Sequence, residues 1–289
     1  MTRRELALTL ALTQGIGGKT VTRVLARNDL LSRSPEEFLR LSPESLREEY
    51  RLTEKVAKAV SQVGVSFPTE IREMERRLDG LGVILMTAAD AQYPPGLEEM
   101  DEDPPGVLFL YGNQRILHGT TFCVLSSRNS HPAALDQVES LTEEGVLSGE
   151  VLVSGHNRPE YQRSAIVPLR WGAPRILCLD QGLFSALGED LKEEPFRSAR
   201  LWRYQFDPVT DLVVTPFRPE SHFSGVNNKV RDRLVAGLSA RLDFVDIQVG
   251  GNMERLARQA LRAGRRVRVS DRSISYRTFQ EAGAQIISA

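Results

Sequence analysis

The stretch "FVDIQVGGNMERLARQALRAGRRVRV" (residues 244–269) places a strand, a glycine turn, a helix and a second strand in close succession. Phe244–Val249 and Val267–Val269 are short, largely apolar runs of the kind that form buried strands. The segment 252–263 between them is predicted to be a helix, because its apolar residues recur at helical spacing: Met253, Leu256, Ala257, Ala260 and Leu261. A strand, a helix and a strand in this order predict two parallel strands joined by a crossover helix.

The same alternation extends toward the N-terminus. A helix-like segment at 133–145 separates the strand-like runs Thr121–Leu125 and Val151–Val153. Further apolar runs occur at Val83–Met86, Val107–Tyr111, Arg175–Leu179 and Leu212–Val214. Because these runs are continuously apolar, we expect an α/β fold with a mostly parallel sheet that helices cover on both faces.

The first part of the chain has helical patterns instead. "SPEEFLRL" (34–41) and "SPESLREEY" (42–50) each place serine before proline and glutamate, which is typical of a capped helix start. A helix is also expected over Thr20–Ala26, and the pattern changes to strands at Gly82. We therefore expect a helical domain over residues 1–80 and an α/β domain over residues 81–289.

The composition allows a large core but gives no overall attraction to nucleic acid. Of the 289 residues, 41% are hydrophobic, and the net charge is −1, so nucleic-acid binding would need a local basic patch. No run of about 18 apolar residues occurs, so we expect no membrane span. Cys123 and Cys178 lie in apolar runs, which favours reduced thiols in a cytoplasmic protein. The cysteines and histidines lack the spacing of metal ligands, so we expect no metal site.

Two strand ends carry candidate ligand-binding residues. Ser127 and Arg128 follow the strand at 121–125, and Gly155 follows the strand at 151–153. Ligands of doubly wound folds lie beyond the carboxyl ends of the strands, where a hydroxyl and a guanidinium bind phosphate. A capped turn with a solvated arginine explains Ser127 and Arg128 equally well.

A second group of candidates lies at two helix starts. In "NNKVRDRLVAGLS" (227–239), Lys229, Arg231 and Arg233 add positive charge to a helix N-terminus, and that arrangement suits an anion. Asp232 is expected to cap the helix or to pair with one arginine. In the turn before the next helix, Gly251, Asn252 and Arg255 are expected to reach the same anion. Arg258 and Arg262 are instead expected on a solvated basic face.

The glycine turn "TQGIGGKT" (13–20) is a further candidate. A turn of this kind between two helices exposes backbone N–H groups, so Gly15, Gly17 and Lys19 are expected to make a secondary contact with phosphates. The alternative is a helix–helix corner that needs glycine for its backbone angles. We find no arrangement of Ser, His and Asp, no paired carboxylates and no nucleotide-hydrolysing signature, so no catalytic residue and no cofactor are expected.

Nearly the whole chain resembles the DNA-processing protein A (DprA, or Smf) family, with similar motifs in the same order. "AADAQYPPGLEEMDEDPPGVLFLYGN" (88–113) resembles the family's D-x-x-YP-x-x-L and DPP-x-VL-x-x-GN motifs. Ser127-Arg128 is similar to the end of VGSR, and "VLVSG" (151–155) to VVSG. "VRDRLVAGLS" (230–239) resembles RNRIIAGLS. "GAPRILCLDQGL" (172–183) and "YRTFQEAGAQII" (276–287) are similar to later family motifs.

This resemblance implies a fold and a function. The fold is an extended Rossmann-like domain preceded by a small SAM-like or helix-hairpin-helix domain. The function is the binding of single-stranded DNA in natural transformation or recombination by a cytoplasmic homodimer, which protects the strand and loads the RecA recombinase on it. The resemblance implies no catalysis.

The departures from the family pattern cluster at the expected pocket. Ser126 replaces the glycine of VGSR, and Asp232 replaces the asparagine of RNR. Gly250-Gly251-Asn252 replaces SGS, and the residues after Gly155 do not follow the family's pattern. Two other hypotheses therefore stand beside the DNA-binding mediator. One is a sensor or hydrolase of a nucleotide derivative, and the other is a relative with a degenerate pocket that acts as an interaction scaffold.

Overall fold

The computed structural model describes residues 1–63 and 67–288, and the chain divides into two compact units. Unit 1 comprises Met1–Tyr93 and Glu102–Phe109, and unit 2 comprises Pro94–Asp101 and Leu110–Ala289. The expected boundary between residues 80 and 81 lies in the turn between α6 (Phe67–Asp79) and β1 (Val83–Thr87).

Unit 1 is mainly helical. Capping starts its helices: the Thr2 hydroxyl accepts from the Glu5 N–H before α1, and Ser34 does the same for Glu37 before α3. Ser42 caps α4, so both predicted Ser-Pro helix starts are confirmed. Besides α6, the helices are α1 (Arg3–Ala11), α2 (Gly18–Leu30), α3 (Pro35–Leu39), α4 (Pro43–Tyr50) and α5 (Glu54–Ser61). Leucine, valine and aromatic side chains form their shared core, including Leu10, Val24, Leu25, Phe38 and Leu46.

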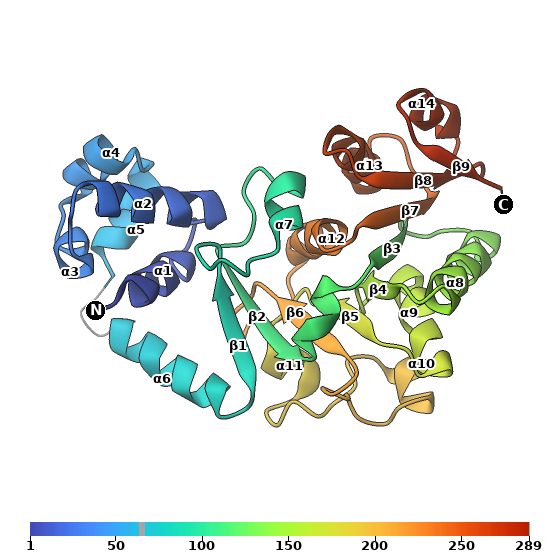
Figure 1. Ribbon diagram of the computed structural model, residues 1–289, viewed down its shortest axis with the longest axis horizontal. Helices are drawn as coiled ribbons and strands as arrows, with labels where there is room; N and C mark the ends of the chain where they lie inside the picture. The colour runs from blue at the N-terminus through green and yellow to red at the C-terminus, as the bar shows by residue number, and fades with distance from the viewer. Residues whose placement is uncertain (64–66, 289) are drawn as a thin grey trace. The chain divides into compact units, whose positions relative to one another are not determined.

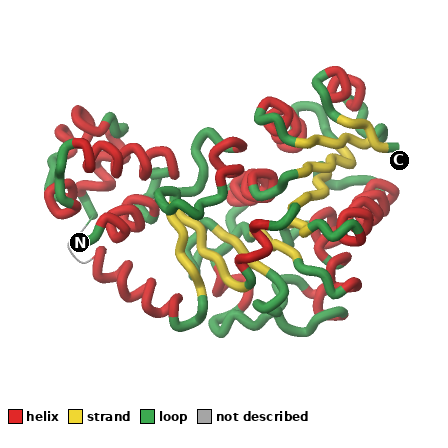
Figure 2. Tube along the Cα trace, in the orientation of Figure 1, coloured by secondary structure: helices red, strands yellow, loops and turns green. Residues whose placement is uncertain are grey.

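Unit 2 is a parallel α/β unit (Figures 1 and 2). Its strands are β3 (Thr121–Ser126), β4 (Val151–Ser154), β5 (Arg175–Cys178), β6 (Leu212–Thr215), β7 (Arg241–Asp246), β8 (Arg266–Ser270) and β9 (Gln285–Ile287). They lie in the order β6-β5-β4-β3-β7-β8-β9, and each neighbouring pair is parallel. Two further strands are β1 and β2 (Val107–Gly112). The predicted α/β class with a mostly parallel sheet is confirmed.

Helices cover the unit 2 sheet on two faces. On one face α8 (Pro132–Leu147) packs on β3, β4 and β7, with Phe122, Val124 and Val245 in the shared core. On the other face α13 (Asn252–Arg262) packs on β7 and β8, and α12 (Asn227–Gly237) contacts α13 and β5. The remaining elements are α7 (Pro95–Met100), α9 (Pro159–Ala165), α10 (Val167–Trp171), α11 (Leu183–Leu187), α14 (Tyr276–Glu281), η1 (Gln114–His118) and η2 (Arg197–Leu201).

The predicted strand at 244–249 is wrong in its bounds, because β7 begins at Arg241 and ends at Asp246. Its first half carries charges that the apolar pattern does not include. The Arg268 guanidinium from β8 pairs with the Asp243 carboxylate at 2.6 Å, and Arg241 pairs with Glu150 at 2.6 Å. Paired in this way, charged residues enter a buried strand without leaving an isolated charge.

Candidate nucleic-acid interface

A pocket of about 300 Å³ opens at the carboxyl edge of the unit 2 sheet. Its walls are the loops after β3, β4 and β7 and the first turns of α12 and α13. β3 pairs with β4 on one side and with β7 on the other, and at such a reversal of strand order an open parallel sheet leaves a crevice for ligands. The lining residues are Ser127, Arg128, Arg158, Asn228, Lys229, Asp232, Gln248, Gly251, Asn252 and Met253.

Hydrogen bonds between loops fix the β3 and β7 sides of the pocket. The Gln248 N–H donates to the Ser127 hydroxyl at 2.9 Å, and the Ser127 N–H donates to the Asp246 carbonyl at 2.9 Å. The Gln248 side-chain amide donates to the Arg128 carbonyl at 3.2 Å. These bonds hold the backbone of Arg128 in place, while its side chain remains exposed to solvent.

Three cationic side chains line the pocket and have no carboxylate partner in the part of the chain that the structure describes. Arg128 and Lys229 are exposed and Arg158 is half-buried. Among the described residues, none of these three side chains forms a hydrogen bond or an ion pair. Burial and the nearby charge of Arg231 lower the pKa of Arg158. Cations left unpaired at a pocket are free to bind an anion.

The starts of α12 and α13 both lie at the pocket, and the start of α13 adds backbone donors; in α12 the N–H groups of Asn227 and Lys229 already donate to the carbonyls of Ser224 and Val226. No side-chain hydrogen bond caps α12 at Val226 or α13 at Gly251. The first N–H groups of a helix have no partner within the helix and carry a partial positive charge. Asn228 and Lys229 in α12 and Asn252 in α13 therefore line the pocket from two helix N-termini.

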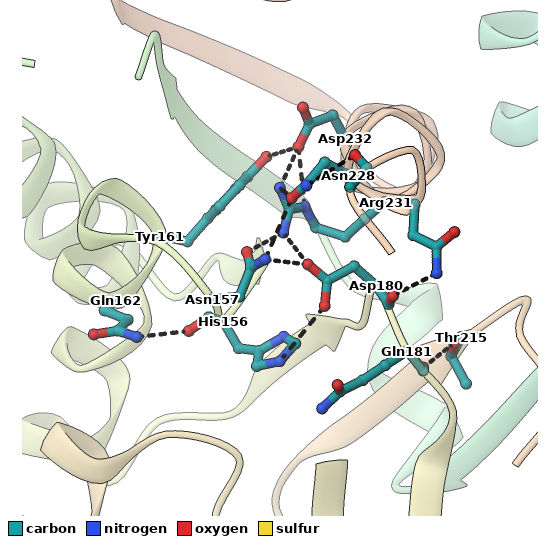
Figure 3. Close-up of polar contacts among 12 residues, drawn as sticks. His156, Asn157, Tyr161, Gln162, Asp180, Gln181, Thr215, Asn228, Arg231 and Asp232 are labelled. Carbon is teal, nitrogen blue, oxygen red and sulfur yellow. Dashed lines mark hydrogen bonds and ion pairs between the residues drawn. The ribbon is translucent and has the colours of Figure 1, made fainter. Parts of the chain in front are cut away.

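Arg231 lies inside the protein, contrary to the sequence prediction of a phosphate contact (Figure 3). Its side chain is 0% exposed. Its guanidinium donates to Asp232 at 2.9 Å, to Asp180 at 3.1 Å and to Asn228 at 3.1 Å. It also lies over the Tyr161 ring, 4.5 Å from the centroid. Arg231 therefore ties α12 to the loops after β4 and β5 and is not presented to a ligand.

The groups around Arg231 have shifted pKa values. Burial and the positive charge of Arg231 lower the pKa of His156 to about 4. His156 Nε2 is 3.8 Å from the Asp180 carboxylate, whose pKa burial raises. Burial and the Asp232 carboxylate raise the pKa of Tyr161, whose hydroxyl donates to Asp232 at 2.8 Å. His156 is thus neutral at pH 7.

The other predicted residues divide into two groups. Of the predicted set, the structure brings together at the pocket Ser127, Arg128, Lys229, Gly251 and Asn252. Arg255 does not line the pocket, although its guanidinium donates to the Asn252 side chain at 2.6 Å. Arg233 points elsewhere, because its guanidinium pairs with Asp101 at 2.7 Å. Gly155 is buried under the network, where an added Cβ would lie 2.8 Å from Arg231 Cδ.

The glycine turn at 13–20 lies in unit 1. Gly15 has a φ of +86°, which favours glycine, and the Gly18 N–H donates to the Pro104 carbonyl at 2.7 Å. The Asp103 carboxylate packs directly on Gly17, where an added Cβ would lie 2.0 Å from its oxygen. This geometry matches a helix–helix corner, and the acidic group at Gly17 disfavours a phosphate there. Lys19 is exposed.

The predicted set of site residues leaves out three that matter at the site, although the sequence places Arg158 beyond the strand at 151–153, where a ligand is expected. Arg158, Gln248 and Asp180 follow strands β4, β7 and β5 at the carboxyl edge of the sheet. Arg158 and Gln248 line the pocket, and Asp180 holds Arg231. For Arg158 and Asp180 the available signal was their position after predicted strands, because that edge is where such folds bind ligands. Gln248 gave no such signal, because the predicted strand at 244–249 contains it, whereas β7 ends at Asp246.

Two further searches cover the described residues only. Within residues 1–63 and 67–288, no group of three or more His, Cys, Asp or Glu side chains is arranged to hold a metal ion. In the same residues, no helix is both long enough and apolar enough to cross a membrane.

The fold and the pocket define a class: a Rossmann-like α/β protein with a crevice lined by cationic side chains where its strand order reverses. The chain belongs to the DNA recombination-mediator protein A family, whose sequence profile matches residues 84–288. This match confirms the resemblance that the motifs indicate. Among curated proteins, none matches the chain.

Solved structures share the fold. DNA processing protein A (DprA) from Streptococcus pneumoniae is similar over 99% of this chain and 95% of its own, with a TM-score of 0.73 and 19% identity. DNA processing protein A from Helicobacter pylori, a protein with a single-stranded DNA binding mode, is similar over 71% of this chain and 90% of its own, with a TM-score of 0.54 and 16% identity.

Proposed function

We propose that this chain binds single-stranded DNA at the unit 2 pocket through phosphate contacts and acts as a recombination mediator without catalysis. The observation that carries the proposal is a group of three cations, Arg128, Arg158 and Lys229, which have no ion-pair partner among the described residues and lie around two helix N-termini without side-chain caps. Positive side chains and backbone N–H groups are the two kinds of group that bind phosphate oxygens. Ser127, Gly251 and Asn252 complete the proposed contact surface.

The comparisons support the DNA-binding part of this proposal. The family is that of recombination mediators, and a structural relative from Helicobacter pylori has a single-stranded DNA binding mode. By extension, we propose a cytoplasmic homodimer that protects single-stranded DNA and loads the RecA recombinase. At the glycine turn 13–20, we propose a secondary DNA contact through the exposed Lys19 alone.

Burial of the reactive groups favours binding over catalysis. Burial raises the pKa of the Cys123 thiol to about 12, and Cys178 is fully buried with its pKa also raised. His156 is 4% exposed and lies under the Arg231 network. A catalytic acid, base or nucleophile must reach the group on which it acts, and these side chains do not line the pocket.

The test is the fluorescence anisotropy of a labelled oligo-dT, titrated with protein at several salt concentrations. Each phosphate neutralised on a single strand contributes about −0.7 to the slope of log affinity against log salt. Three contacts predict a slope of about −2, which means roughly a 20-fold loss of affinity between 50 and 200 mM salt. Arg128→Ala or Lys229→Ala should each reduce the slope to about −1.4.

The control is Arg262→Ala, which removes an exposed arginine of α13 that does not line the pocket. This variant should bind like the unmodified protein. If it weakens binding as much as Lys229→Ala does, the pocket is not the binding site.

The same protein tests the two alternative functions. Thermal stabilisation by mononucleotides without binding of oligo-dT would favour the nucleotide sensor, and binding of neither ligand would favour the interaction scaffold.

A further inference from the structure

One lining residue of the pocket has the wrong charge for an anion site. Asp232 belongs to α12 and lines the pocket together with Arg128, Arg158 and Lys229. Its side chain is 4% exposed, so water screens its charge little. A carboxylate in this position repels a phosphate that the three cations attract. Its presence therefore needs a physical account.

Hydrogen bonds hold the Asp232 carboxylate in a single orientation. Oδ1 accepts from the Tyr161 hydroxyl at 2.8 Å and from Arg231 Nε at 2.9 Å. Oδ2 accepts from the side-chain amide of Asn252 at 2.8 Å. These four side chains connect α9, α12 and α13, so the carboxylate cannot turn away when a ligand arrives.

The same bonds determine how much positive charge the pocket presents. Arg231 contacts two carboxylates, those of Asp180 and Asp232, so its own charge is fully compensated inside the protein. Because the Asn252 amide nitrogen donates to Asp232, its carbonyl oxygen is directed to Arg255, which donates to it at 2.6 Å. Asp232 thereby neutralises the charge of Arg231 directly. Through its bond to Asn252 it also keeps the Arg255 guanidinium bound to the neutral Asn252 side chain.

We propose that Asp232 is a built-in counter-charge that limits the affinity of this pocket for phosphate and so keeps its hold on a single strand weak and reversible. The proposal rests on the proposed function of the pocket and assigns to Asp232 the control of its strength. The ligand class is the phosphodiester backbone.

Replacing the carboxylate by its neutral isostere tests the proposal. Asp232→Asn retains the size of the side chain and its acceptor for Tyr161 and Arg231. Its amide nitrogen would face the Asn252 amide, so Asn252 must turn its carbonyl oxygen toward position 232 and release Arg255. The variant should bind labelled oligo-dT about tenfold more tightly at low salt, because a unit negative charge near the phosphate is gone. The salt slope should steepen by about 0.7 if one more phosphate is contacted.

Two matched variants separate charge from structure. Asp190→Asn removes the same charge from an exposed residue that does not line the pocket, and should leave binding unchanged. Tyr161→Phe removes one hydrogen bond to Asp232 but no charge, and should change the affinity less than twofold. If Tyr161→Phe tightens binding as much as Asp232→Asn does, loosening of the network explains the effect, and the counter-charge proposal is wrong.

The outcomes distinguish the two proposals. If the unmodified protein binds oligo-dT and Asp232→Asn, folded by its circular dichroism spectrum, binds no more tightly, the counter-charge is refuted and the proposed function stands. If only Asp232→Asn binds oligo-dT, the carboxylate prevents DNA binding in the unmodified protein. That result supports the counter-charge and refutes the proposed function. If neither binds, both proposals fail. An Asp232→Asn variant that does not fold refutes the counter-charge, because the carboxylate is then needed for the fold.

Discussion

Arg231→Ala should unfold unit 2 at a much lower temperature, because Arg231 is a structural cation. Its guanidinium is 0% exposed and compensates two carboxylates, those of Asp180 and Asp232. Removing it leaves two buried negative charges side by side. Loss of one partner from a buried ion pair typically costs about 3–5 kcal/mol of the free energy of unfolding.

For a unit of this size, that loss corresponds to a fall in the melting temperature of roughly 6–20 °C. The assay is thermal unfolding followed by circular dichroism, at pH 7. Lys229→Ala is the matched control: Lys229 lies two residues earlier in α12 but is exposed, so its replacement should change the stability by less than about 0.5 kcal/mol. If Arg231→Ala melts within about 2 °C of the unmodified protein, the guanidinium is not structural and our interpretation of the network is refuted.

Three further predictions follow from buried groups. In the folded protein the pKa of His156 is about 4, whereas in the unfolded chain it is about 6.5. Between these two pH values the side chain is protonated only in the unfolded chain. Lowering the pH from about 6.5 toward 4 should therefore lower the free energy of unfolding by up to about 3 kcal/mol. Urea unfolding at pH 7 and pH 4.5 measures this loss, and His156→Gln should lack this part of the pH dependence; an unchanged dependence would mean that His156 is not buried as a neutral group. Cys123 and Cys178 should not react with a thiol reagent in the folded protein and should both react in denaturant, whereas fast reaction of the folded protein would contradict their burial. Gly155→Ala should lower the free energy of unfolding by about 1–3 kcal/mol, because the new Cβ would lie 2.8 Å from Arg231; stability equal to that of the unmodified protein would show that the network yields easily.

The sequence predicts the architecture well, because apolar periodicity reports burial. The alternation around 244–269 leads to a parallel sheet, and Ser34 and Ser42 start helices as their pattern predicts. The bounds of β7 are missed because Arg241 and Asp243 are charged, and only the fold shows the partners that allow their burial.

The site is harder to predict from residue types alone. Lys229, Arg231 and Arg233 are all cations at one helix start, yet only Lys229 lines the pocket. The helical turn directs Arg231 inward and Arg233 toward Asp101, and the carboxylates that receive them come from distant parts of the sequence. Arg158 lines the pocket and has no ion-pair partner within residues 1–63 and 67–288; it follows a predicted strand but belongs to no motif of its own.

The central claim is that single-stranded DNA lies in the unit 2 pocket, and photocrosslinking tests it most directly. An oligo-dT carrying 5-iodouracil is irradiated with the protein, and the crosslinked peptides are identified by mass spectrometry. The account predicts crosslinks in the loops after β3 and β7 and at the start of α12, within segments 127–131, 248–253 and 226–230. Crosslinks confined to the glycine turn at 13–20, or to surfaces of unit 2 away from the pocket, would contradict it.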